Sequence, residues 1–147
     1  MYFVTAVLAL LMVAETFAIK YTDCGSKKGK VVDVLLSGCE DSDVCELKRG
    51  ETYSYGLTFE SLTDSKSLKA VVHGVIGGIS MPYPIPNSNA CEGSNVECPL
   101  ESGNTYMYGN EIEIRKSYPS VRADVKWELR DENNENVVCV LIPVQIV

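Results

Sequence analysis

The clearest constraint on the fold is an alternation of apolar and polar side chains with a period of two residues. In residues 121–130, VRADVKWELR, every second side chain from Val121 to Leu129 is apolar, and each one between them is charged. Residues 52–60, TYSYGLTFE, repeat the pattern, with three aromatic residues and a leucine on one side. A period of two turns one face of a β-strand toward a core and the other toward water.

Apolar, β-branched or aromatic residues also dominate four other segments. These are VVDVLL at 31–36, LKAVVHGVIGGI at 68–79, YMYGNEIEI at 106–114 and VVCVLIPVQIV at 137–147. Turn-forming stretches such as DENNEN at 131–136 separate them, and no stretch has a convincing ten-residue helical period. The sequence therefore predicts an all-β fold, an antiparallel β-sandwich of about seven strands.

All six cysteines lie beyond residue 18, and an even number in an exported chain predicts three disulfides, with fifteen possible connectivities. Spacing favours two short loops, one across EDSDV and one across EGSNVE, and leaves one long-range pair. The favoured pairs are Cys39–Cys45, Cys91–Cys98 and Cys24–Cys139. A zinc site is the alternative, but it requires spacings nearer C-x-x-C and is usual in a reducing compartment. We predict no metal.

The N-terminus has the pattern of a secretory signal peptide over residues 1–18. An eleven-residue apolar run, Val4 to Ala14, is followed by Thr16-Phe17-Ala18, which places small residues at the cleavage positions. The run is shorter than the roughly 20 residues that cross a bilayer. We therefore expect a single soluble, exported domain of residues 19–147. Its acidic excess, a formal net charge of −7 for the whole chain, opposes nucleic-acid binding.

Signals of catalysis are sparse. The one histidine, His73, lies in an apolar strand, where a satisfied structural role is more usual than a catalytic one. The sequence has no G-x-S-x-G, H-E-x-x-H or phosphate-binding glycine loop. Glu111 and Glu113 fall on the polar side of their strand and predict a solvated face rather than a glycosidase pair. We predict that the protein is not an enzyme and uses no cofactor.

The segment MPYPIP at 81–86 is apolar but rich in proline, which lacks an amide donor and fixes its own φ. It is therefore predicted to lie outside helices and outside the middle of a sheet. Its side chains must nevertheless be buried against something. Two interpretations stay open: the segment caps the core, or it frames an opening to an apolar cavity between the sheets.

Eight short motifs, spread in order along the chain, resemble the soluble Niemann-Pick type C sterol carriers of the ML lipid-recognition family. They are DCGS at 23–26, KAVVHG at 69–74, PYPIP at 82–86, CPL at 98–100, TYMY at 105–108, YPS at 118–120, WELRD at 127–131 and IPVQIV at 142–147. The resemblance covers the whole predicted domain, with all six cysteines in register. It implies an immunoglobulin-like β-sandwich whose sheets separate around a sterol in an apolar cavity, with the same three disulfides.

The resemblance also implies which residues frame the opening. In the family these are an aromatic residue of the proline-rich loop, a branched aliphatic residue before the YPS turn, and the tyrosine of that turn. The matching residues here are Tyr83, Ile114 and Tyr118, and Pro82 and Pro84 flank the first of them. Vertebrate members carry phenylalanine where this chain has Tyr83.

By resemblance, the protein is expected to carry a sterol to membranes or to a membrane partner, such as the large membrane-bound Niemann-Pick type C sterol transporter, and to be a monomer. Two other ligands stay open: fatty acids or semiochemicals in an extracellular fluid, and microbial lipids recognised in innate immunity. No N-x-S/T triplet is present, and sorting by mannose-6-phosphate needs an N-glycan. Plain secretion and residence in the lysosome lumen therefore both stay open.

Overall fold

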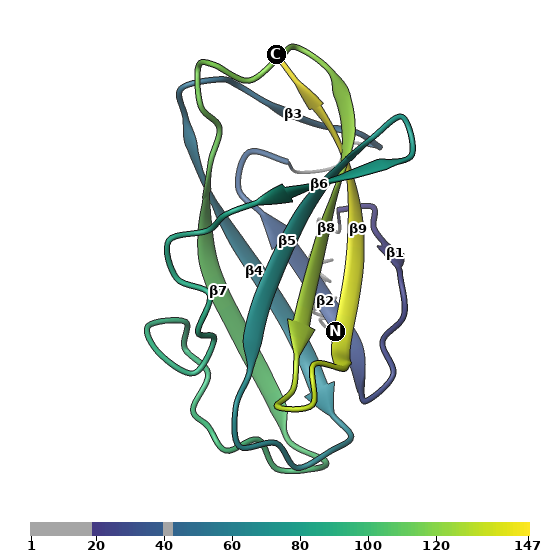
Figure 1. Cartoon of the computed structure of the whole chain (residues 1–147), viewed down its shortest axis with the longest axis vertical. Coiled ribbons are helices and arrows are strands. Elements are labelled where there is room, and N and C mark those ends of the chain that lie inside the picture. Colours follow the sequence, from purple (N-terminus) through teal and green to yellow (C-terminus); the bar gives the residue numbers. More distant parts are fainter. Residues whose placement is uncertain (1–18, 40–42) are drawn as a thin grey trace, which may run out of the picture.

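The computed structural model describes residues 19–39 and 43–147, and within them the regular elements are all strands (Figure 1). The predicted signal peptide, residues 1–18, lies outside the described residues. The strands are β1 (Thr22–Asp23), β2 (Gly29–Leu36), β3 (Cys45–Leu47), β4 (Thr52–Ser61), β5 (Lys69–Ile76), β6 (Ile79–Tyr83), β7 (Thr105–Glu113), β8 (Arg122–Arg130) and β9 (Asn136–Ile146).

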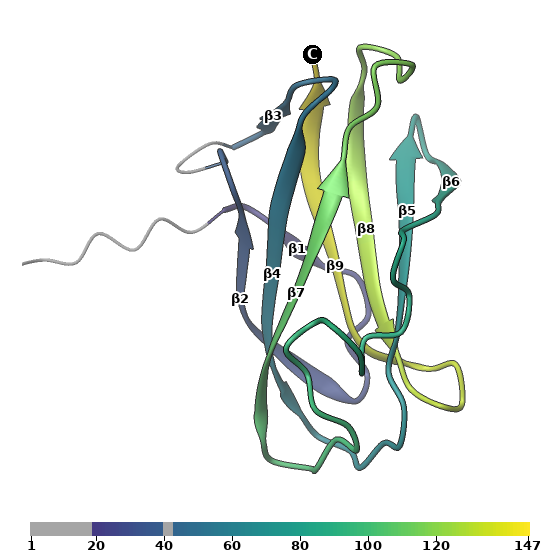
Figure 2. The same cartoon turned by 90° about the vertical axis from the view of Figure 1, so that its left-hand side faces the viewer.

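The strands form two sheets that face each other as layers (Figure 2). The larger sheet has the order β1-β9-β8-β5-β6, and the smaller has the order β2-β4-β7. All neighbours on these two paths are antiparallel, whereas β3 pairs in parallel with the end of β9. The predicted antiparallel β-sandwich is confirmed, with three short strands beyond the six long ones that the alternation indicates.

The sequence predicts residues 68–79 as one continuous β-rich segment. In the structure this segment folds back on itself. Gly77 and Gly78 have φ of 58° and 81°, a left-handed conformation that glycine adopts at little cost. The two residues form the turn of the β5–β6 hairpin. Met81 to Tyr83 therefore belong to strand β6, which lies at the edge of the larger sheet and not in its middle. Proline is tolerated here because β6 is an edge strand, so Pro82 needs no donor on its outer side.

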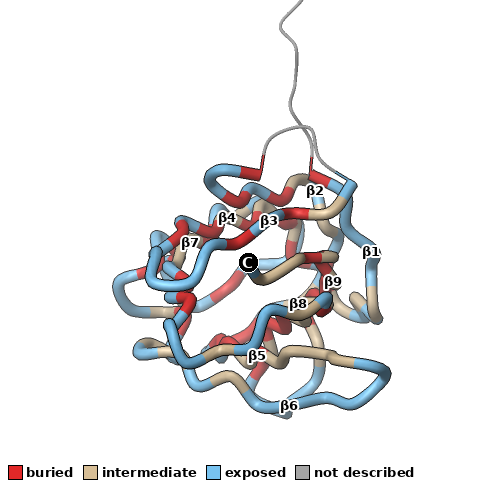
Figure 3. The backbone as a smooth tube through the Cα atoms, turned by 90° about the horizontal axis from the view of Figure 1, so that it is seen from above, coloured by how far each residue is buried: buried red, intermediate tan, exposed pale blue. Residues whose placement is uncertain are grey.

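The core lies between the two layers, and Figure 3 shows buried residues, in red, on strands of both sheets. The largest fully buried side chains are Trp127, Tyr108 and Phe59. Trp127 of β8 stacks on Tyr55 of β4, with ring centroids 4.1 Å apart and planes inclined by 17°. Burial of such rings is worth several kcal/mol each, and aromatic stacking adds about 0.5–1.5 kcal/mol.

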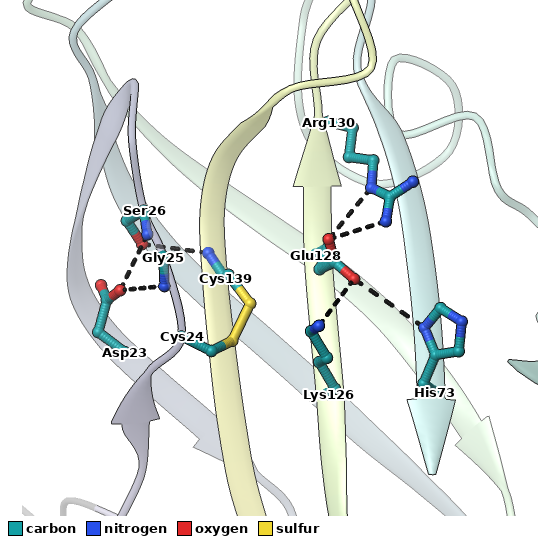
Figure 4. The surroundings of a disulfide bond; sticks show 9 residues. All are labelled: Asp23, Cys24, Gly25, Ser26, His73, Lys126, Glu128, Arg130 and Cys139. Atoms are coloured by element: carbon teal, nitrogen blue, oxygen red, sulfur yellow. Dashed lines mark hydrogen bonds and ion pairs between the residues drawn. A yellow bond between two sulfur atoms is a disulfide. The ribbon is translucent and has the colours of Figure 1, made fainter. Parts of the chain in front are cut away.

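The structure contains the three disulfides that the spacing favours. Cys24–Cys139 ties the N-terminal segment to β9, and the Cys24 N–H also donates to the Cys139 carbonyl at 3.0 Å (Figure 4). Cys39–Cys45 and Cys91–Cys98 close local loops. The second of these loops lies along the free edge of β7, where the Gly109 N–H donates to the carbonyl of Ser94 at 2.9 Å. Such a cover protects the edge from pairing with another chain.

Candidate functional site

Tyr83 and Tyr118 meet at one end of the sandwich, across the gap between the two sheets. Tyr83 ends the edge strand β6 of the larger sheet, yet its hydroxyl donates to the carbonyl of Glu113, the last residue of β7 in the smaller sheet, at 2.6 Å. The Tyr83 and Tyr118 rings pack edge to face, with centroids 6.2 Å apart and planes at 72°. We call the region framed by Tyr83, Ile114 and Tyr118 the mouth.

Ile114 follows β7 directly and is held by backbone hydrogen bonds to the start of β4. Its N–H donates to the carbonyl of Glu51 at 2.9 Å, and its carbonyl accepts from Gly50 N–H at 2.5 Å. These bonds turn the side chain inward, where it is 3% exposed. Ile114 is therefore an inner wall of the mouth, not an exposed part of its rim.

Tyr118 lies on a tight turn of the β7–β8 connection. The Tyr118 N–H donates to the carbonyl of Arg115 at 3.1 Å, and the Tyr118 carbonyl accepts from Arg49 Nη1 at 3.3 Å. The side chain is half-buried. Its backbone is thus fixed at two points, while its ring meets Tyr83.

Pro82 and Pro84 flank Tyr83, and both are exposed. Pro82 lies opposite His73 of β5 in the antiparallel register, and Pro84 comes directly after the strand. Their restricted φ stiffens the backbone on both sides of Tyr83. The structure thus places them on either side of Tyr83 at the mouth, and contact of either proline with a ligand stays a prediction.

The Tyr83 phenol is protonated over the whole physiological pH range. Burial, followed by the neighbouring Tyr118 and the Glu113 carboxylate, raises the pKa of Tyr83 to about 12, although its bond to the Glu113 carbonyl acts in the opposite direction. Its hydroxyl therefore remains a hydrogen-bond donor. The contact that closes the mouth between β6 and β7 does not depend on pH in this range.

Open space lies beside the mouth, at Gly74 of β5. Along β5 the inward-facing positions alternate, so Gly74 has the same orientation as the buried Val72. A Cβ placed on Gly74 would meet no atom within 4 Å, although its strand neighbours Val125 and Met81 lie opposite it in register. Gly74 therefore leaves open space on the inward side of β5, next to the exposed Met81.

The β5–β6 hairpin extends beyond the mouth and carries exposed apolar side chains. Ile79 is 69% exposed and Met81 is 53% exposed. Met81 belongs to the MPYPIP segment that the sequence offered as a frame of an opening, whereas Ile79 was not singled out. A glycine within a strand predicts a bulge or close approach of another group, but Gly74 has no atom within 4 Å of an added Cβ.

The outer face of the larger sheet holds an ion cluster around Glu128 (Figure 4). Its carboxylate accepts hydrogen bonds from Arg130 Nε at 3.1 Å and Nη2 at 3.0 Å, with Lys126 Nζ at 3.7 Å. His73 Nδ1 lies 3.9 Å from the carboxylate. The alternation predicted a wet face here, yet Glu128 is only 3% exposed, because these cationic side chains surround it.

Residues 19–39 and 43–147 contain no group of three or more metal-binding side chains. In the same ranges, no helix is long and apolar enough to cross a membrane. Surface pockets of the described chain include hollows beside Leu35, beside Pro99 and beside Asn87, and none of these three is lined by a residue of the mouth. The lipid cavity stays a prediction.

Two facing β-sheets with an aromatic mouth at one end define the class of small lipid-recognition sandwiches. The family model described as "ML domain" matches residues 18–146. The chain belongs to this ML-domain family.

Curated relatives and solved structures agree with that assignment. The bovine protein (Bos taurus) named "NPC intracellular cholesterol transporter 2" is 42% identical over 139 residues, which cover 95% of this chain and 92% of the relative. "NPC intracellular cholesterol transporter 2 homolog a" of Drosophila melanogaster is 40% identical over 146 residues, covering 99% and 97%. The crystal structure of a Niemann-Pick type C2 protein from Japanese carpenter ant has a TM-score of 0.83 and 28% identity, covering 88% of this chain and all of that one.

Proposed function

We propose that this protein is an exported carrier that shelters a sterol between its two sheets and performs no bond chemistry. The observation that carries the proposal is the aromatic mouth at one end of the two facing sheets, with open space at Gly74 beside it. The names of the bovine and Drosophila relatives support a sterol as cargo. Burying a sterol removes several hundred Å² of apolar surface from water, which at about 25 cal/mol per Å² is on the order of 10 kcal/mol.

The closed mouth implies that the lipid enters when the bridge between β6 and β7 opens. Tyr83 would then swing away from Glu113 and Tyr118, exposing Ile114 as an apolar inner wall. Pro82 and Pro84 limit the conformational freedom that this segment can lose on binding, which lowers the entropic cost. Our proposed ligand-binding residues are Tyr83, Ile114, Tyr118, Pro82 and Pro84.

Delivery is proposed to take place at a membrane surface, which the β5–β6 hairpin touches transiently. Ile79 and Met81 present apolar side chains next to the mouth, as a segment that dips into a bilayer interface requires. A large membrane-bound sterol transporter is a further proposed recipient. We propose that the carrier acts as a monomer in an extracellular fluid, consistent with its three disulfides and the missing N-x-S/T triplet.

Binding of a fluorescent sterol, dehydroergosterol, tests the proposal. We expect saturable binding by the wild-type protein and strong loss of binding in Gly74→Phe, because the new ring fills the open space. Val75→Phe is the control, since it places the same phenylalanine ring on the other side of the same strand. If the wild type binds no sterol, or if the two variants bind equally, the proposal is wrong.

Extraction of lipids that copurify with the protein, followed by mass spectrometry, identifies the cargo. A sterol supports the proposed function. A fatty acid or a semiochemical would replace the sterol while keeping the carrier role, and a bacterial glycolipid would favour the innate-immune alternative.

A further inference from the structure

Three aromatic side chains form a cluster in the middle of the sandwich, beneath the mouth. We call Tyr55 of β4, Tyr108 of β7 and Trp127 of β8 the aromatic cluster. Ring centroids lie 4.1 Å apart for Tyr55–Trp127, 5.9 Å for Tyr108–Trp127 and 6.3 Å for Tyr55–Tyr108. All three side chains are at most 3% exposed. The cluster connects the two sheets, because Trp127 belongs to one and both tyrosines to the other.

Two polar atoms of this cluster are buried without a hydrogen-bond partner in the described part of the chain. They are the hydroxyl of Tyr55 and the indole Nε1 of Trp127. The Tyr108 hydroxyl differs, because it accepts a hydrogen bond from Asn110 Nδ2 at 2.9 Å. Burial raises the pKa of the Tyr108 phenol, and the neighbouring Asn110 and Trp127 side chains act in the opposite direction. Trp127 Nε1 nevertheless has no hydrogen-bond partner. Buried polar groups nearly always have partners, so two orphans side by side require an explanation.

The cluster lies within reach of a lipid that enters at Gly74. Trp127 is the next inward-facing position of β8 after Val125, which pairs with Gly74 of β5. Successive inward positions on a strand are about 7 Å apart. In the same row of the sheet, Trp127 faces Val72, which in turn faces Tyr83 of the mouth. A molecule that extends inward from Gly74 along this face by one side-chain spacing would reach the Tyr55–Trp127 pair.

The chemistry of the two orphan groups limits what can satisfy them. An indole N–H only donates, whereas a phenol hydroxyl both donates and accepts. Burial, and then the neighbouring Tyr108, raise the pKa of Tyr55 well above its usual value, so this hydroxyl keeps its proton. A ligand hydroxyl matches both groups, and a carbonyl oxygen can accept from both.

An ionised headgroup does not fit the same place. In residues 19–39 and 43–147 no lysine, arginine or histidine is buried, so a carboxylate or phosphate beside Tyr55 would have no cationic partner. Burying an unpaired charge costs far more than burying a hydrogen-bonded neutral group. The site thus discriminates between neutral oxygen-bearing lipids and ionised fatty acids.

We infer that the cargo is a neutral lipid whose inward-pointing end carries a hydroxyl or carbonyl oxygen, and that Tyr55 and Trp127 bind this oxygen. The inference rests on the proposed carrier function and adds a polar anchor to a site that otherwise selects only for apolar bulk. It makes Tyr55 a specificity-determining residue.

Three sterols that differ only in their oxygen atoms test the anchor. Cholest-5-ene has none, cholesterol has a ring hydroxyl, and 25-hydroxycholesterol has a second hydroxyl at the opposite end. Each competes with dehydroergosterol for the wild type, for Tyr55→Phe and for the control Tyr106→Phe. The Tyr106 hydroxyl accepts from Glu101 N–H at 2.7 Å in a loop, and its loss should leave sterol preference unchanged.

We expect the wild type and Tyr106→Phe to prefer at least one hydroxylated sterol over cholest-5-ene by about tenfold, and Tyr55→Phe to bind all three within about twofold. The hydroxylated sterol that binds more weakly to Tyr55→Phe than to the wild type shows which end of the sterol points inward. If Tyr55→Phe keeps the wild-type preference, the anchor is refuted while the carrier function stands. If the wild type binds none of the sterols, the proposed function itself has failed.

Two further measurements keep the test independent of folding defects. Without lipid, Tyr55→Phe should unfold at the same urea concentration as the wild type or a higher one, because the lost hydroxyl has no partner. A clear loss of stability would mean that the hydroxyl is already satisfied, and would overturn the inference. Trp127 is the only tryptophan, so its emission should shift to longer wavelength with the preferred sterol and stay unchanged with cholest-5-ene.

Discussion

The Tyr83 hydroxyl donates a hydrogen bond of 2.6 Å to the carbonyl of Glu113 and so joins the edge strands of the two sheets. This bridge closes the side of the sandwich at which the open space beside Gly74 lies. Phenylalanine at this position would keep the ring but could not form the bridge, so the bridge depends on the tyrosine hydroxyl and not on the fold alone.

Removing the bridge should speed lipid exchange. In Tyr83→Phe the ring remains but the hydrogen bond is lost, and about 1 kcal/mol corresponds to roughly fivefold faster opening. Stopped-flow mixing with dehydroergosterol measures the uptake and release rates. Tyr106→Phe, which removes a hydroxyl from the loop at Glu101, should leave both rates unchanged. Equal rates for Tyr83→Phe and the wild type would show that the bridge does not control access.

Apolar side chains of the β5–β6 hairpin should govern transfer to membranes rather than binding. Ile79→Asp removes burial worth about 1.5–3 kcal/mol at the bilayer, so transfer of sterol to lipid vesicles should slow by about tenfold or more. Affinity for sterol in solution should not change. Met107→Asp is the control, because Met107 is 66% exposed on the smaller sheet. Equal slowing in both variants would point to a general charge effect instead.

The long-range disulfide should stabilise the fold more than the short one across residues 91–98. Cys24 and Cys139 are 115 residues apart, whereas Cys91 and Cys98 are seven apart. In the chain-entropy view the lost stability is about 5 kcal/mol for the first pair and about 2 kcal/mol for the second. Urea unfolding of the double Cys→Ala variants measures both, and losses in the reverse order would contradict this account.

Asp131 should stabilise the protein throughout mildly acidic conditions. Burial acts to raise the pKa of its carboxyl, but hydrogen bonds from Lys28 at 2.8 Å and from the N–H groups of Glu135 and Asn133 outweigh it, so the pKa lies below 3.8. A carboxyl with a lowered pKa contributes stability that is present above its unfolded pKa and is lost as pH falls through the folded value.

Asp131→Asn should therefore cost about 1 kcal/mol at pH 5 to 7, and the difference from the wild type should shrink below pH 4. Urea unfolding across this range tests the expectation. Asp124→Asn on β8, the strand that precedes Asp131, is the control, because the Asp124 carboxylate makes no ion pair or hydrogen bond within the described residues. A constant difference from pH 3 to pH 7 would contradict the assigned pKa.

The sequence by itself determined the fold class and the covalent framework. Alternation over 52–60 and 121–130 specifies which side chains face inward, since side chains alternate strictly along a strand. The spacing of the cysteines favours the pairing that the folded chain contains. Both signals are local, and neither depends on how the two sheets are placed.

Only the tertiary structure decided how distant segments meet. No local pattern indicates that Tyr83 reaches Glu113 of the other sheet, or that Gly74 faces unfilled space. Alternation also misled at Glu128, whose polar position became buried once Arg130, Lys126 and His73 gathered around it from two strands. Alternation assigns a face to each side chain, whereas strand order and the approach of the two sheets set the neighbours on that face.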